Sequence, residues 1–119
     1  MEQFPEKWQG LMLRTGQFRP EEEVLRMLFK QLQTDFNRAG LQLPFGETPY
    51  AAGWAQPLSE LLSRAPNQTL RSLIYLVDLS ESQTAEILTS PKPFLKLSEA
   101  ILYRELVKVY FQLYYSSEL

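Results

Sequence analysis

Cysteine and histidine are both absent from this chain of 119 residues. Without them the chain cannot form a disulfide, a thiolate nucleophile, a Ser-His-Asp triad or the usual zinc and haem ligand sets. Carboxylates alone can hold Mg²⁺ or Ca²⁺, but aspartate occurs only at Asp35 and Asp78, and no calcium-loop spacing is present. We therefore expect no enzyme activity, no cofactor and no metal site.

Net charge and long apolar runs are also scarce. The formal net charge is −2, which gives no uniform field to hold a nucleic acid or an anionic membrane. No apolar run approaches the roughly 18 residues of a membrane span. Residues 1–10 lack the basic and apolar regions of a signal peptide. These features predict a cytoplasmic protein with no membrane contact.

The composition that is present fits one globular domain over residues 1–119. Hydrophobic residues make up 45% of the chain and charged residues 22%, whereas disordered chains lack this much apolar material. Folding a chain of this length buries roughly two thirds of the surface of the unfolded chain, so one core can stabilise the fold without a disulfide or a structural metal.

Apolar spacing and helix start and stop signals predict an all-α chain. Gly16 ends the first helix, Pro20 and three glutamates start the second, and Ser80 with Gln83 forms a capping box. The predicted helices span residues 6–15, 20–39, 58–64, 68–78, 80–88 and 94–115. The helix at 68–78 is apolar on most sides, which indicates a central position. The predicted fold is a single-domain all-α bundle of five or six helices with a long C-terminal helix.

Residues 41–57 contain three prolines and two glycines, so we expect a long loop there. Phe45, Tyr50 and Trp54 give this loop an unusual aromatic content. One interpretation is that these rings plug the end of the bundle. Another is that Trp54 and Tyr50 lie in a protein interface, or that the loop covers a small-ligand cavity.

The C-terminal helix carries two apolar stripes at helical spacing, although one is enough to dock a helix. The first stripe contains Leu102, Leu106, Val109 and Leu113. The second contains Tyr103, Val107, Tyr110 and Tyr114, with Phe111 beside it. Tyrosine suits surfaces that are half core and half interface, so the second stripe is the leading interface candidate. The alternative is that this chain, through its aromatic loop, covers the stripe itself.

The charged residues predict solvated faces. Lys92, Lys96, Arg104 and Lys108 are interleaved with Glu99 and Glu105, and Glu105 can pair with Lys108 three residues later. The glutamates at 21–23 together with Asp35 are also expected to face solvent.

Residues 73–88 resemble a helix-turn-helix unit, with an apolar helix, a turn at Asp78 and a second helix capped by Ser80. The resemblance implies that the second helix contacts DNA. That helix offers glutamates and no lysine or arginine, whereas phosphate contacts supply much of DNA affinity. An ordinary helical corner explains the same pattern, and nucleic acid is not the expected partner.

Together these features predict a non-enzymatic interaction or assembly module. Its expected partner is another protein or its own copy, in a homodimer paired through the C-terminal helix. Two alternatives stay open: a DNA-binding regulator using residues 70–88, and a small-ligand binder using the 41–57 loop.

Overall fold

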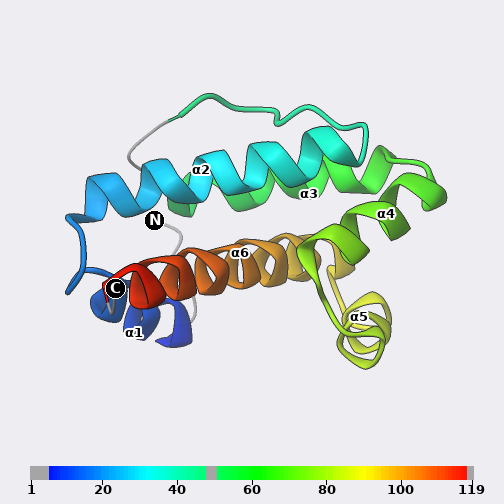
Figure 1. Ribbon diagram of the computed structural model, residues 1–119. Helices are drawn as coiled ribbons and strands as arrows, with labels where there is room; N and C mark the ends of the chain where they lie inside the picture. The colour runs from blue at the N-terminus through cyan, green and yellow to red at the C-terminus, as the bar shows by residue number, and fades with distance from the viewer. Residues whose placement is uncertain (1–5, 48–50, 118–119) are drawn as a thin grey trace.

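The computed structural model describes residues 6–47 and 51–117, and these fold into six α-helices and one short 3-10 helix (Figure 1). The elements in chain order are α1 (Glu6–Thr15), α2 (Glu21–Arg38), η1 (Ala51–Trp54), α3 (Ala55–Arg64), α4 (Asn67–Val77), α5 (Glu81–Leu88) and α6 (Pro93–Ser117). The prediction of an all-α bundle with a long C-terminal helix is confirmed.

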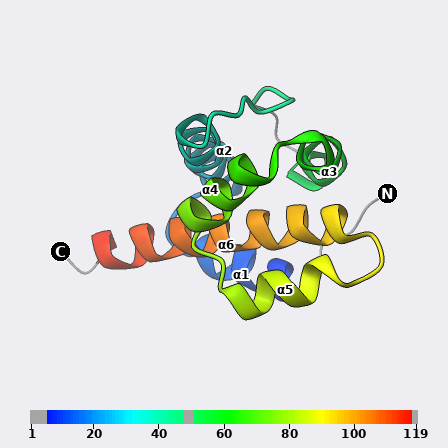
Figure 2. The same ribbon diagram turned by 90° about the vertical axis from the view of Figure 1, so that its right-hand side faces the viewer.

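Helix α6 is the centre of the molecule and packs against α1, α2, α3, α4 and α5. Figures 1 and 2 show α2 and α3 on one side of α6, and α1 and α5 on the opposite side. Helix α4 crosses α6 near its middle. Because α6 is apolar around most of its circumference, it can bury surface against neighbours on several sides at once. The six helices therefore form one globule around a single central helix.

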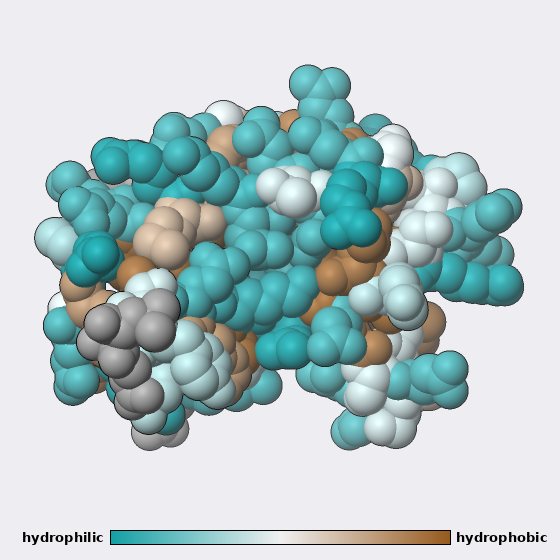
Figure 3. All heavy atoms as spheres, viewed as in Figure 1, coloured by the Kyte–Doolittle hydropathy of each residue, from teal (hydrophilic) through white to brown (hydrophobic). Residues whose placement is uncertain are grey.

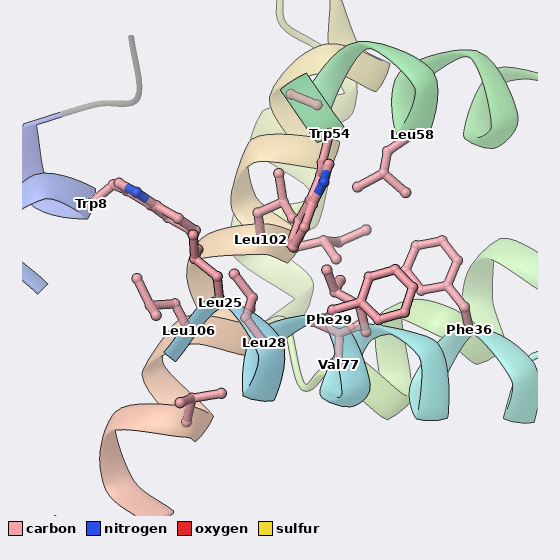
Figure 4. Packing of buried hydrophobic residues seen from close by; sticks show 14 of the residues in the cluster. Trp8, Leu25, Leu28, Phe29, Phe36, Trp54, Leu58, Val77, Leu102 and Leu106 are labelled. Atoms are coloured by element: carbon pink, nitrogen blue, oxygen red, sulfur yellow. The ribbon is translucent and has the colours of Figure 1, made fainter. Parts of the chain in front are cut away.

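The first stripe of α6 lies in the core, as predicted. Its four residues, Leu102, Leu106, Val109 and Leu113, are buried. They meet the apolar face of α2 and the buried leucines of α3, and Figure 4 shows Leu25 and Leu28 of α2 beside Leu102 and Leu106. Burying a leucine side chain stabilises a fold by roughly 1.5–3 kcal/mol, so this shared core accounts for the close docking of α6.

Local signals set the ends of α2. Three glutamates occupy its first turn, next to the positive end of the helix dipole. At the other end, Gly40 adopts a positive φ of 86°. This conformation turns the chain so that the Leu41 amide donates to the Phe36 carbonyl at 2.8 Å, which satisfies a terminal acceptor of the helix.

Two predictions about helix positions were wrong. Helix α3 begins at Ala55, three residues before the predicted start at Leu58, and η1 precedes it directly. The loop therefore does not extend to Pro57, because proline is tolerated in the first turn of a helix, where no intrahelical donor is required. Helix α4 is also peripheral instead of central: only Leu73 and Val77 are buried in it, and Tyr75 is 83% exposed.

Candidate interaction surface on helix α6

The second stripe of α6 is partly covered by the N-terminal part of the chain. Tyr103, Val107 and Tyr110 are half-buried and pack against the core. Lys7 of α1 places Nζ 4.4 Å from the centre of the Tyr103 ring. Phe18 meets Tyr110 edge to face, with ring centres 6.0 Å apart. The N-terminal part of the second stripe therefore packs against α1 and the segment that follows α1.

Helix α6 ends in a group of aromatic rings that we call the aromatic end, consisting of Tyr110, Phe111, Tyr114 and Tyr115. Phe18 covers one side of this group, because it meets Tyr114 edge to face at 6.4 Å as well as Tyr110. Phe111 is 44% exposed, Tyr114 37% and Tyr115 61%. Successive turns place the rings in contact, with Phe111 and Tyr115 stacked at 6.0 Å and Tyr110 and Tyr114 stacked at 6.1 Å. The sequence from Val109 to Ser117 contains no charged residue. The aromatic end is thus an uncharged surface with large exposed rings.

The aromatic residues of the 41–57 segment lie elsewhere. Trp54 is only 2% exposed and stacks on Phe45 with ring centres 5.1 Å apart. It also meets Phe29 of α2 edge to face at 6.0 Å, and Figure 4 shows it inserted between α3, α2 and α6. Trp54 is therefore a core residue here and not an exposed anchor for a partner. Tyr50, the other candidate of this segment, lies outside the described residues.

A cluster of three charged residues lies between α2, α4 and α6, where the sequence predicted solvated faces. Lys108 Nζ lies 3.0 Å from Asp35 Oδ2 and 2.9 Å from Glu105 Oε1, and it donates to the Leu76 carbonyl at 2.9 Å. Asp35 is 3% exposed and Glu105 is fully buried. The prediction that Asp35, Glu105 and Lys108 face solvent was wrong, because α2 and α4 pack over this part of α6.

The pKa of Glu105 is raised to about 8, mainly because burial penalises the charged form; the neighbouring Asp35 also raises this pKa, while Lys108 lowers it. Neither carboxyl oxygen of Glu105 receives a well-directed hydrogen bond from the described part of the chain. Both observations fit a Glu105 carboxyl group that stays protonated at neutral pH, which lowers the negative charge buried in the cluster.

The sequence did contain a signal for this cluster. Asp35 follows Leu28 and Leu32 at helical spacing, on the apolar face of α2, and Glu105 lies four residues after Ile101 on the buried face of α6. Burying an unpaired charge is costly, so a charged residue on an apolar stripe must either be buried with a partner or lie on a stripe that stays exposed. The position of Lys108 three residues after Glu105 allows such a partner, but it fits a solvated face as well.

The α4–α5 corner has the turn and cap that the helix-turn-helix resemblance suggested. Asp78 adopts a left-handed conformation with φ of 72°, and Ser80 Oγ accepts a hydrogen bond from the Gln83 amide at 3.1 Å. Arg104 of α6 holds the turn by an ion pair with Asp78 at 2.9 Å. The exposed side of α5 carries Glu81 and Glu86. The corner is thus fastened to α6 and presents acidic groups outward.

The part of the chain that the structure describes contains no group of three carboxylates placed to hold a metal ion. None of the described helices combines the length and apolarity needed to cross a membrane. The chain matches no protein-family model, and no curated protein or solved structure matches it significantly.

Proposed function

We propose that this protein is a non-enzymatic assembly module of the cytoplasm that pairs with its own copy through the aromatic end of α6. The observation that carries the proposal is the group of mutually stacked rings on the last two turns of α6, of which Phe111, Tyr114 and Tyr115 are exposed. Exposed aromatic clusters are common at interfaces, because tyrosine and phenylalanine bury a large area and lose little side-chain entropy.

A second copy is the partner whose chemistry fits best. The aromatic end carries no charge over Val109 to Ser117, so two copies related by a two-fold axis bring no like charges of this segment together. A strongly charged partner would leave its charges without counterparts on this surface. The tyrosine hydroxyl groups can hydrogen-bond at the rim of such an interface, while the rings pack in its centre.

The DNA-binding alternative has less support. Its candidate recognition helix, α5, exposes Glu81, Gln83 and Glu86 and contains no lysine or arginine. Carboxylates facing the phosphate backbone oppose association at every ionic strength. Salt-dependent binding to a mixed duplex pool would nevertheless reverse this preference.

Sedimentation equilibrium of the full chain at micromolar to millimolar concentrations tests the proposal. We expect reversible dimerisation, and we expect the double variant Phe111→Ser, Tyr115→Ser to weaken it by about tenfold or more. Tyr75→Ser is the matched control, because Tyr75 is an exposed ring on α4, away from the aromatic end. A monomer at all concentrations, or equal weakening by the control, would reject the proposal.

A further inference from the structure

A groove opens on α6 toward its N-terminal half, away from the aromatic end. Its volume is about 280 Å³. Ala100 and Tyr103 of α6 form the floor, Trp8 of α1 forms one wall, and Ile87 of α5 forms the other. Figure 3 shows the lower edge of the molecule notched between the α1 side and the protruding α5. The groove is thus built from the consecutive helices α5 and α6 together with α1 from the start of the chain.

The size and lining of the groove suit a small molecule with an apolar part. A cavity of about 150 Å³ holds benzene, so about 280 Å³ holds a molecule with a ring and one short polar group. The floor and walls offer an indole, a phenol ring, an isoleucine and an alanine, whose small side chain leaves the space above α6 open. Such an apolar lining with a few polar groups at its edge is typical of ligand sites.

The rim of the groove carries both signs of charge. Glu86 and Gln83 of α5 line one edge, and Lys96 and Glu99 of α6 line the opening. Within the described part of the chain, Glu86, Gln83 and Lys96 make no side-chain hydrogen bond or ion pair with another residue. Lys7, in contrast, lies over the Tyr103 ring, and Glu99 already has an interaction of its own. Of the charged groups at the rim, Lys96 and Glu86 are therefore the ones available to a ligand.

We propose that this groove binds a free amino acid with an apolar side chain. The ligand side chain packs on Ala100 and Tyr103, its carboxylate pairs with Lys96, and its ammonium group pairs with Glu86. A zwitterion pairs with both Lys96 and Glu86 at once, whereas a ligand with a single charge pairs with only one of them and leaves the rim group of its own sign without a partner.

Helix α5 is the wall that can adjust to the ligand. None of its residues is buried, and it is flanked by two residues with positive φ, Asp78 at 72° and Lys92 at 53°. Segments with few buried contacts open most readily. A ligand that joins Glu86 to Lys96 ties α5 to α6, so binding should slow the amide exchange of α5.

A nuclear magnetic resonance titration of the full chain with L-phenylalanine tests the proposal. A ligand of this size in a half-open groove should bind with a dissociation constant on the order of 1 mM. We expect saturable shifts in α5, in the start of α1 and in residues 96–103, together with slower exchange of the α5 amides. Phenylethylamine and 3-phenylpropionate, which each lack one charge, should bind about tenfold more weakly. No saturable shifts in this region, or equal affinity for the singly charged compounds, would overturn the proposal.

Variants locate the site. Lys96→Met and Glu86→Gln should each weaken L-phenylalanine binding by about tenfold, and both are surface changes that leave the core intact. Lys30→Met and Glu22→Gln on the exposed face of α2 are the matched controls and should have no effect. Ala100→Leu should abolish binding by filling the floor, with circular dichroism and thermal unfolding to confirm the fold. Unchanged affinity in Lys96→Met and Glu86→Gln would reject the site, even if Ala100→Leu failed to fold. None of these variants changes the aromatic end, so self-association is tested independently.

Discussion

Lys108 of α6 and Asp35 of α2 form an ion pair of 3.0 Å across 73 residues of sequence. The same ammonium group reaches the Leu76 carbonyl near the end of α4. One side chain therefore joins three helices at a place where their apolar faces also meet. Such a group fixes how far α2 and α4 can slide along α6, because any displacement separates a buried carboxylate from its cation.

Replacing Lys108 with methionine should destabilise the fold strongly. The variant keeps the apolar stem but leaves Asp35 buried without a cation, and breaking a buried pair in this way costs roughly 3 kcal/mol or more. Urea unfolding at pH 7 measures the change. The control is Arg26→Met, whose partner Glu47 lies 3.3 Å away with both side chains about half exposed. It should cost less than about 1 kcal/mol, and equal losses in the two variants would contradict the role of Lys108.

Glu105 should make the stability fall as the solution becomes alkaline. The unfolded chain releases this proton near the ordinary pKa of 4.5, whereas the folded chain holds it to about pH 8. The folded state binds more protons between these values, so the free energy of unfolding falls by about 1.4 kcal/mol per pH unit in that window and levels off above it. Urea unfolding at pH 5 to 9 records the slope.

The Glu105→Gln variant isolates this contribution. Glutamine has nearly the same size and shape as glutamic acid and stays polar, but it does not ionise. We expect a stability close to that of the parent near pH 5 and a gain on the order of 2 kcal/mol or more at pH 9. Glu60→Gln, at an exposed position of α3, is the control and should leave the slope unchanged. A parent protein as stable at pH 9 as at pH 5 would show that Glu105 ionises without cost.

The sequence predicted the elements that depend on local signals. Helices α1, α2, α5 and α6 follow from apolar spacing together with Gly40, Ser80 and the early glutamates of α2, each of which acts within one turn of its own helix. The buried stripe of α6 was also predicted, because its four residues share one face over three turns.

The remaining features depend on contacts between distant segments. Glu105 and Lys108 have the same spacing on a solvated face as in a core, and only the arrival of α2 with Asp35 decides between the two. Likewise, the aromatic content of residues 41–57 does not reveal that Trp54 stacks on Phe45 and meets Phe29. The ring that covers Tyr110 is Phe18, which lies 92 residues earlier in the sequence, and helical periodicity alone does not indicate this contact.

Loss of the Ser80 cap should loosen α5 more than the rest of the protein. Ser80→Ala removes the acceptor of the Gln83 amide, a change worth about 1 kcal/mol. Because α5 buries no residue, this cost should appear as local opening, with faster amide exchange in α5 and little change in α6. Thr69→Ala in the first turn of α4 is the control, since α4 has no side-chain cap to lose. Equal acceleration throughout the chain would indicate that α5 opens only with global unfolding.

Trp54 should matter for stability and leave self-association unchanged. Its ring is 2% exposed and fills the space between α2, α3 and α6, so Trp54→Ala should cost about 3–5 kcal/mol by leaving a cavity. Trp54→Phe keeps part of the ring contact with Phe45 and should cost about half as much.

The control is Leu13→Ala, which removes an apolar side chain that is 77% exposed and should change stability by less than about 0.5 kcal/mol. Thermal and urea unfolding rank the three, and sedimentation of folded Trp54→Phe should match the parent. If Trp54→Phe were as stable as the parent but associated more weakly, Trp54 would lie in the interface. The 41–57 segment would then have to open in the dimer.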